Sequence, residues 1–155
     1  MERSGPDAKN VGRRPIATTP GTRRSMRSNC RVDTRPEVAL RRVLHATGLR
    51  FRKDLRIVLN GTNVRPDVVF TRVKVAIFLD GCWWHRCPEH GMQPKRNAEF
   101  WARKFDENVF RDRRADAALM TANWAVIRVW EHEDLDLAAQ RIVAVVNARR
   151  AADLV

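Results

Sequence analysis

The stretch from Asp80 to His90, which reads D-G-C-W-W-H-R-C-P-E-H, constrains this chain more than any other segment. It holds two of the three cysteines, two of the four histidines and two of the five tryptophans. A hydrophobic core does not need such side chains so close together. Metal binding, acid–base chemistry and stacking on flat aromatic groups each use several of them. We therefore expect a metal-pinned loop that also carries part of a functional site.

The cysteine and histidine spacing in this loop predicts a metal site. Cys82, Cys87 and His90 are three soft or borderline ligands close together in sequence, and His132 follows a later apolar segment. Zn²⁺ prefers four nitrogen or sulfur ligands in a tetrahedron, and four protein ligands leave no open position for water. The pattern therefore predicts a structural Zn²⁺ that fixes the loop. The alternative is two buried free thiols beside two unrelated histidines.

His85 is not needed by that zinc site. It lies between Trp84 and Arg86, so one interpretation is an ordinary surface histidine. The other is a general base, because the reference pKa of imidazole, about 6.5, suits proton transfer at neutral pH.

Length and composition predict one folded domain without a membrane span. The chain has 155 residues, of which 44% are hydrophobic, and no apolar run approaches the length of a membrane helix. The N-terminus is basic but lacks the apolar block of a secretory signal. An odd number of cysteines, two of them in a metal-like spacing, favours a reducing compartment over a disulfide scaffold. We expect a cytoplasmic protein.

Charge points to nucleic acid as the partner. Thirty Lys and Arg residues against eighteen Asp and Glu residues give a net charge of +12. A positive field of this size favours nucleic acid through counterion release and electrostatic steering. Codon bias in a GC-rich genome would explain the preference for Arg over Lys, but it would not explain the net excess of positive charge.

The first 22 residues show almost no apolar periodicity and are rich in Gly, Pro, Thr, Ser and Arg, so we expect a disordered basic arm at 1–22. Such an arm can lie along a phosphate backbone, and the alternative is a solvated tail without a role. Met26, set among arginines, is an apolar group that could wedge into a DNA groove.

Periodicity predicts a mixed α/β domain. Asp33 or Thr34 can cap a helix that stops at Gly48. The segment 49–59 alternates loosely and ends at the turn dipeptide Asn60-Gly61. Further strands are expected at 67–71, 74–79 and 124–130, and helices at 97–120 and 137–150. This order implies a mixed sheet flanked by helices.

Two carboxylates form a second candidate site, separate from the Cys/His metal site. Asp67 begins one expected strand and Asp80 ends the next, so two antiparallel neighbours would bring both to the same end of the sheet. Paired carboxylates there can hold Mg²⁺, which activates water and neutralises charge on a phosphoryl centre. The pattern resembles that of PD-(D/E)xK nucleases, although Cys82 occupies the position of the lysine.

With these residues assembled, the chain resembles the very short patch repair (Vsr) endonucleases, a family of mismatch-nicking enzymes. The resemblance runs from about Ser25 to His132, and residues 23–151 are the expected Vsr-like endonuclease domain. Six blocks carry it: D-T-R-P-E (33–37), R-P-D-V-V-F (65–70), V-A-I-F-L-D-G-C-W-W-H-R-C-P-E-H (75–90), F-W-A-R-K (100–104), N-V-F-R-D-R-R (108–114) and W-A-V-I-R-V-W-E-H (124–132).

The resemblance implies a restriction-endonuclease-like α/β fold and Mg²⁺-dependent nicking 5′ to the thymine of a T:G mismatch, which arises when 5-methylcytosine deaminates. Asp67 would be the metal-binding carboxylate and His85 the catalytic histidine. Leu79 would offer its backbone carbonyl to Mg²⁺, and Glu37 would be a supporting acid, although a first-turn glutamate also suits the helix dipole. The family pattern has a second histidine where this chain has Asp80, so Asp80 would either bind metal or handle protons.

The resemblance also implies a DNA interface. Trp83, Trp84 and Trp101 fall where the family inserts aromatic residues beside the mismatch, and the alternative is that Trp83 or Trp84 is core. Cys82, Cys87, His90 and His132 fall at or near the family's structural zinc ligands. The long helix would hold the DNA backbone through Arg103, Lys104, Arg111, Arg113 and Arg114.

Two other functions fit the same residues. One is a zinc-containing module that binds DNA lesions without catalysis, and the other is a restriction-type nuclease with a different target. A nicking enzyme needs only one active site, which favours a monomer acting on double-stranded DNA, and other repair proteins are conceivable partners.

Overall fold

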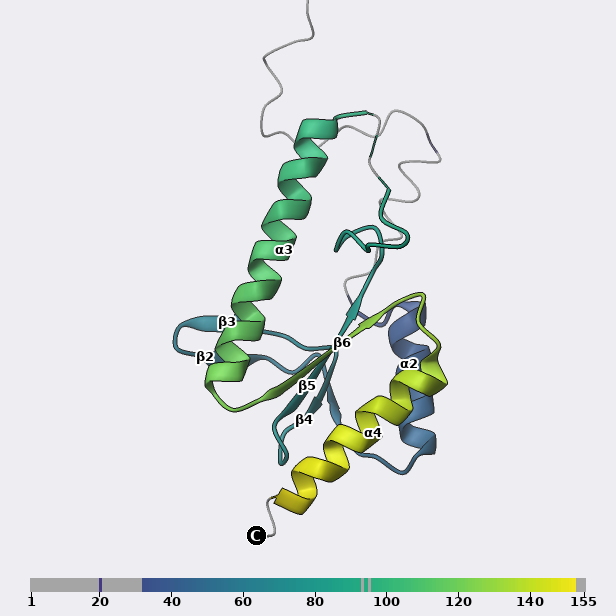
Figure 1. Cartoon of the computed structure of the whole chain (residues 1–155), viewed down its shortest axis with the longest axis vertical. Coiled ribbons are helices and arrows are strands. Elements are labelled where there is room, and N and C mark those ends of the chain that lie inside the picture. The colour runs from purple at the N-terminus through teal and green to yellow at the C-terminus, as the bar shows by residue number, and fades with distance from the viewer. Residues whose placement is uncertain (1–19, 21–31, 93, 95, 153–155) are drawn as a thin grey trace, which may run out of the picture.

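The computed structural model describes residue 20 and residues 32–92, 94 and 96–152 (Figure 1). Met26 and, apart from residue 20, the expected arm at 1–22 lie outside the described residues. The elements, in chain order, are α2 (Arg35–Ala46), β1 (Arg52–Lys53), β2 (Ile57–Leu59), β3 (Thr62–Val64), β4 (Val68–Phe70), β5 (Val75–Asp80), α3 (Ala98–Thr121), β6 (Ala125–Trp130) and α4 (Leu135–Ala152).

The main sheet is mixed, as the sequence predicts. Its strand order is β1-β4-β5-β6, and β4 runs antiparallel to β5 while β6 runs parallel to it. The antiparallel register pairs Val68 with Ile77, and the parallel register pairs Phe78 with Arg128. The parallel pair is joined by the long helix α3, which gives the chain room to return to the same end of the sheet.

Helices cover both faces of the sheet (Figure 1). One face of β5, with Val75 and Ile77, packs against α2 and α4 through Leu40 and Ile142. The other face, which includes Ala76, packs against Leu119 of α3 and Val64 of β3. Burial on both sides explains why β5 is an almost unbroken apolar run and confirms the prediction of a central strand.

The segment 49–59 differs from the expected single strand. It forms β1 and β2, which belong to different sheets, because Asp54 adopts a left-handed backbone with φ of 44° and redirects the chain between them. Asn60 and Gly61 form the expected tight turn, with φ of 45° and 79°. The turn leads into β3, a strand that the hydrophobic pattern did not predict because only three residues pair with β2.

No helix in the described part of the chain combines the length and the apolar character needed to cross a membrane.

Candidate nuclease site and metal-binding cluster

Asp67 and Asp80 lie at the same end of the sheet, as predicted from antiparallel strands. The backbone N–H of Leu79 donates to Oδ2 of Asp67 at 2.7 Å, which fixes this carboxylate against β5. Both acids line a cleft of about 660 Å³. Its wall includes the side chains of Glu37, Asp67, Asp80, His85, Arg111, Asp112 and Arg128, together with Asp54, Arg56 and Arg65.

The surroundings of Asp67 suit a bound cation. Burial raises the pKa of Asp67 to about 6, and the nearby charges of Glu37 and Asp80 add to this, while the Leu79 N–H and Arg41 oppose it. A buried carboxylate crowded by other carboxylates is relieved when a cation binds. Within the described residues no hydrogen bond reaches Oδ1 of Asp67, so this oxygen is available as a ligand.

The carbonyl of Leu79 is also placed for a cation. The β4–β5 pairing begins at Val68 and Ile77, so Leu79 lies beyond the start of β4. Backbone groups along a strand alternate in direction, and the N–H and the carbonyl of one residue point to the same side. Since the Leu79 N–H points to Asp67, its carbonyl also faces that side, where no strand of the described residues pairs with it.

Glu37 is a buried acid and not a solvent-exposed residue whose only interaction is with the helix dipole. It is 7% exposed, and its carboxylate accepts hydrogen bonds from the Asp33 N–H at 2.9 Å and the Thr34 hydroxyl at 2.8 Å. The expectation that the side chain of Asp33 or Thr34 caps the helix was wrong, because Thr34 holds the capping position without such a bond and turns to Glu37 instead. These bonds hold Glu37 at the edge of the cleft.

His85 lies in the cleft with its orientation fixed. A single turn follows β5, in which the His85 N–H donates to the Gly81 carbonyl at 3.2 Å. Nδ1 of the imidazole lies 2.6 Å from Oδ2 of Asp112 on α3. Because an ionised carboxylate only accepts hydrogen bonds, Nδ1 carries the proton and Nε2 is left for proton transfer. This arrangement suits a general base.

Asp112 remains ionised beside this histidine. Partial burial works to raise the pKa of Asp112, but the hydrogen bond from His85 and the charges of His85, Arg128 and Arg111 outweigh it and hold the pKa below its ordinary value. A charged carboxylate on Nδ1 fixes the tautomer and the orientation of the imidazole.

Two further residues of the site, Asp112 and Arg128, were not predicted from the sequence. Asp112 lies in the block N-V-F-R-D-R-R, whose arginines are the predicted phosphate contacts. Arg128 interrupts an apolar strand, W-A-V-I-R-V-W, and a charged residue inside a core strand was the signal that could have found it. In the structure its Nη1 donates to both carboxylate oxygens of Asp80, at 2.7 and 2.8 Å.

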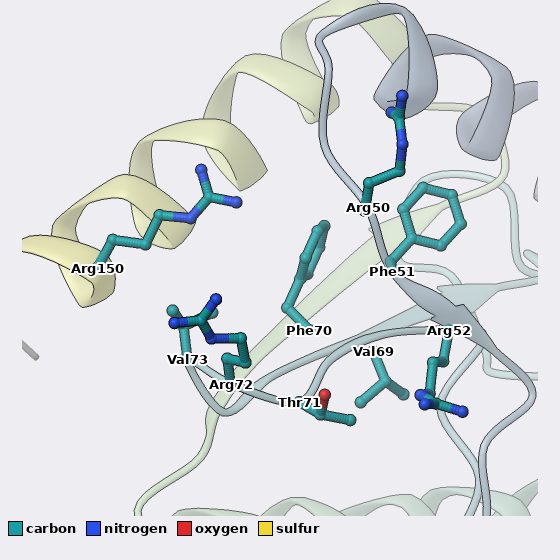
Figure 2. A pocket seen from close by; sticks show the side chains of 9 residues that line it. All are labelled: Arg50, Phe51, Arg52, Val69, Phe70, Thr71, Arg72, Val73 and Arg150. Carbon is teal, nitrogen blue, oxygen red and sulfur yellow. The ribbon is translucent and has the colours of Figure 1, made fainter.

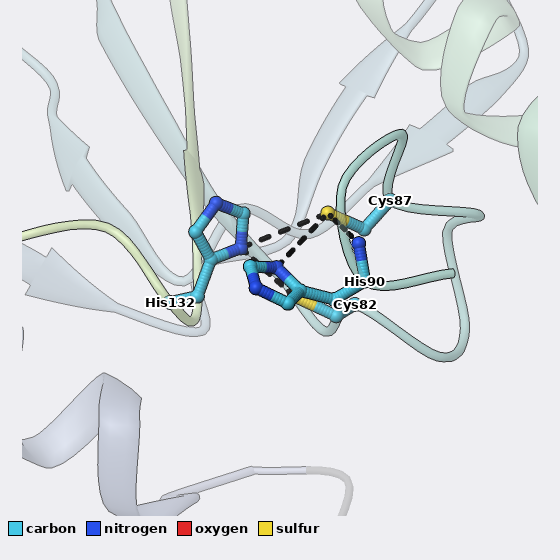
Figure 3. A group of neighbouring side chains, drawn as sticks. All are labelled: Cys82, Cys87, His90 and His132. Atoms are coloured by element: carbon cyan, nitrogen blue, oxygen red, sulfur yellow. Dashed lines mark hydrogen bonds between the residues drawn. The ribbon is translucent and has the colours of Figure 1, made fainter. Parts of the chain in front are cut away.

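Cys82, Cys87, His90 and His132 come together as the spacing predicts (Figure 3). Their four ligand atoms all lie within 4.8 Å of one another. Cys82 Sγ is 3.0 Å from Nδ1 of His132, and Cys87 Sγ is 3.7 Å from the same nitrogen. A tetrahedral zinc site separates sulfur and nitrogen ligands by about 3.5 Å. The donor set and spacing therefore fit a metal ion, and the alternative of unrelated histidines was wrong.

The loop also brings aromatic rings onto the N-terminal half of α3. Trp83 meets Trp101 and Phe105 edge-on, with ring centroids 5.9 and 5.6 Å apart. Trp84 lies 6.0 Å from Trp101 and is 37% exposed, whereas Trp83 is half-buried. Asn108 of α3 donates to the Trp84 carbonyl at 3.1 Å, which ties the loop to the helix. Of the two adjacent tryptophans, Trp84 is the more accessible.

The basic residues predicted to contact DNA occupy one face of α3. Arg103, Lys104, Arg111 and Arg114 are all exposed. At about 100° per residue they fall within an arc of about 100°. Arg111 also lines the cleft, so this face leads towards Asp67 and His85. Arg113 is exposed but lies outside the arc.

A separate cavity of about 620 Å³ lies at the opposite end of β4 and is lined by Arg50, Phe51, Arg52, Val69, Phe70, Thr71, Arg72, Val73 and Arg150 (Figure 2). In Figure 2, Arg72 from the β4–β5 turn and Arg150 from α4 point into the space beside Phe70. Among the described residues no carboxylate and no histidine line it. This part of its wall therefore lacks the side chains that phosphodiester hydrolysis with a cation requires.

Comparison of the sequence with known proteins identifies DNA endonucleases as relatives of this chain. Residues 17–90 match the family model "DNA mismatch endonuclease Vsr". Over 133 residues the chain is 47% identical to the "Type II nicking enzyme V.NaeI" of Lentzea aerocolonigenes, which covers 85% of this chain and 80% of that protein. It is 41% identical over 111 residues to the "Type II nicking enzyme V.XorIIP" of Xanthomonas oryzae pv. oryzae, covering 69% of this chain and 76% of the relative.

A third relative carries the family's name. The "DNA mismatch endonuclease Vsr" of Escherichia coli K12 is 37% identical over 109 residues, which are 70% of this chain and 67% of that protein. Identities of this size over two thirds or more of the chain show that it belongs to the Vsr family of DNA endonucleases.

Proposed function

We propose that this protein is a Mg²⁺-dependent, zinc-stabilised endonuclease that nicks one DNA strand 5′ to the thymine of a T:G mismatch. The observation that carries the proposal is the convergence of the free oxygen of Asp67 and the oriented base His85 on one cleft. Relatives are named as nicking enzymes or as a mismatch endonuclease, which supports the same activity. The proposed fold is of the restriction-endonuclease type, with residues 23–151 as the catalytic domain and residues 1–22 as a basic arm.

The chemistry follows from the positions of the cleft residues. His85 accepts the proton of an attacking water through Nε2 while Asp112 holds Nδ1. The new bond forms between the water oxygen and the phosphorus, and one phosphorus–oxygen bond of the strand breaks. Asp67 and the Leu79 carbonyl would hold Mg²⁺, with Glu37 as a supporting acid, and the ion would neutralise charge on the phosphoryl group.

Cys82, Cys87, His90 and His132 would hold a structural Zn²⁺. The cluster joins the loop after β5 to the end of β6, and Glu131 reinforces the join by accepting the Cys82 N–H at 2.7 Å. His85 and Trp84 sit inside the closed loop. Zinc in this position would therefore fix the loop that carries both the catalytic base and the exposed tryptophan.

Trp84, backed by Trp83 and Trp101, is the proposed wedge into the base stack. Stacking between a base and an aromatic ring contributes about 1–3 kcal/mol per base. That offsets the cost of separating a base step, and a mismatched step costs less to open than a paired one. A preference for mismatches would then follow without many hydrogen bonds to base edges.

The decisive experiment combines the purified protein with Mg²⁺ and with matched or T:G-mismatched duplexes in several sequence contexts. A nick on the thymine strand of the mismatched duplex alone is expected, and Asp67→Ala is expected to abolish it while mismatch binding is retained. Cleavage of matched DNA would point to a restriction-type enzyme. Mismatch binding without any cleavage would point to a lesion-binding module.

A further inference from the structure

Arg128 connects three elements beneath the cleft. It lies on β6 opposite Phe78 of β5, and its guanidinium sits 4.7 Å from the centre of the Phe78 ring. Nη1 donates to both oxygens of Asp80, while Nε and Nη2 donate to the two oxygens of Asp116 on α3, each at 3.0 Å. These contacts engage all three of its nitrogens. Arg128 therefore has little donor capacity left for a DNA phosphate.

Asp80 belongs to the wall of the cleft, but its carboxylate is largely buried there. Its side chain is 6% exposed, and both of its oxygens face Nη1 of Arg128. A buried carboxylate without a cation would be strongly destabilising, so the pairing accounts for its burial. Asp67 differs, because its Oδ2 accepts a backbone N–H and no hydrogen bond in the described structure occupies Oδ1.

The same pairing decides which carboxylate orients His85. Nδ1 of His85 lies 2.6 Å from Asp112 and 3.7 Å from Asp80. The single proton on Nδ1 makes one strong hydrogen bond. Since Arg128 holds both oxygens of Asp80, Asp112 is the carboxylate that receives it.

We propose that Arg128 is a positioning residue of the nuclease site, which keeps Asp80 away from both the cation and His85. Asp67 is then the carboxylate that binds the cation, and Asp112 is the carboxylate that orients the base. Asp80 is then held in an ion pair with Arg128 in the wall of the cleft. This inference rests on the proposed nuclease function, but it concerns cation binding, which is measured without DNA or turnover.

The first test measures Mn²⁺ binding to the full-length, zinc-loaded protein by calorimetry and by electron paramagnetic resonance. Asp80→Asn is expected to leave Mn²⁺ affinity within about twofold of the wild type, whereas Asp67→Asn is expected to weaken it at least tenfold. Equal losses in the two variants would overturn the proposal. This comparison does not depend on substituting Arg128, and it remains informative if the wild type proves not to nick DNA.

The second test releases Asp80. Arg128→Gln is expected to bind Mn²⁺ at least threefold more tightly, because a freed carboxylate joins the cation site, while kcat falls at least tenfold and DNA affinity changes by less than twofold. The double variant Arg128→Gln/Asp80→Asn is expected to recover wild-type Mn²⁺ affinity and most of kcat. A loss of DNA affinity that the double variant does not repair would instead make Arg128 a phosphate contact and overturn the proposal.

Asp116→Asn is the matched control for that series. It removes the carboxylate that accepts hydrogen bonds from Nε and Nη2 of Arg128 and leaves the Asp80 pair intact. Its Mn²⁺ affinity is expected to equal that of the wild type. Tighter Mn²⁺ binding in this variant would show that the effect of Arg128→Gln is a general loss of packing, and would contradict the proposal.

Discussion

Nδ1 of His85 lies 2.6 Å from a carboxylate oxygen of Asp112, and the two residues come from different elements, the loop after β5 and the helix α3. The contact joins the proposed base to the helix that carries the basic face. Asp112→Asn keeps the shape of the side chain but removes its charge and lets it donate a hydrogen bond, which favours the wrong imidazole tautomer. We expect kcat for nicking to fall about 100-fold or more with KM for DNA within about threefold.

The matched control for that prediction is Asp106→Asn, which removes one carboxylate from the exposed side of the same helix, where Asp106 pairs with Arg86 at 2.9 Å. Single-turnover nicking of a mismatched duplex measures both variants. Equal kcat values for Asp112→Asn and the wild type would show that His85 does not depend on this carboxylate.

The lowered pKa of Asp112 also predicts a stability effect at acid pH. Because its pKa is lower in the folded protein than in the unfolded chain, this contribution is fully present above the unfolded pKa and is lost as the pH falls through the folded pKa. The difference in unfolding free energy between the wild type and Asp112→Asn should therefore shrink as the pH is lowered from about 5 to about 3.

Urea unfolding at a series of pH values, followed by circular dichroism, measures this difference. Asp136→Asn, an exposed substitution on α4, is the control for general effects of acid on the fold. A wild-type advantage over Asp112→Asn that stays constant across this range would exclude the proposed charge interaction.

The Cys/His cluster predicts metal-dependent stability. Cys87→Ser replaces a buried thiol that lies 3.7 Å from Nδ1 of His132, and loss of a structural zinc ligand opens the loop. We expect the zinc content to fall from about one ion per chain to near zero and Tm to fall by about 10 °C. Elemental analysis and calorimetry measure the two effects. Cys30→Ser, which removes the remaining cysteine, should keep the zinc, and the cluster would be wrongly assigned if it did not.

Much of this architecture was predictable from local patterns, and the exceptions have physical causes. The apolar run of β5 marks a strand buried on both faces, and Asp67 and Asp80 follow from the antiparallel pairing next to it. The fourth metal ligand, His132, was predictable because β6 runs parallel to β5 and ends beside the loop.

Asp112 and Arg128 were not predictable in the same way. Their roles depend on how far α3 travels before β6 returns to the sheet, and no periodicity within one element records that distance. The same applies to Asp80, whose ion pair with Arg128 is a contact between residues 48 positions apart in the chain.

The exposed ring of Trp84 predicts that this residue contributes to the preference for T:G-mismatched over matched duplex. Trp84→Ala should weaken binding to a T:G duplex by about 5- to 150-fold, the equivalent of about 1–3 kcal/mol, and should affect matched duplex much less. Fluorescence anisotropy with labelled duplexes measures both affinities. Phe110→Ala is the control, since Phe110 is a 64% exposed aromatic residue on α3 that makes no ring contact within the described residues. Equal effects of the two substitutions would remove Trp84 from the wedge.

Removing arginines should change DNA binding on the basic face of α3 but not in the arginine-lined cavity at the far end of β4. Arg103→Ala/Arg114→Ala and Arg72→Ala/Arg150→Ala each remove two positive charges, so the net charge of the two variants is equal. Each phosphate contact contributes about 0.9 to the slope of log K against log salt concentration. For Arg103→Ala/Arg114→Ala, the magnitude of that slope should therefore fall by about 1.8. Arg72→Ala/Arg150→Ala should keep the wild-type slope and nicking rate. A reduced slope in the second variant would mean that DNA also contacts the cavity, and it would contradict the assignment of the backbone contacts to α3.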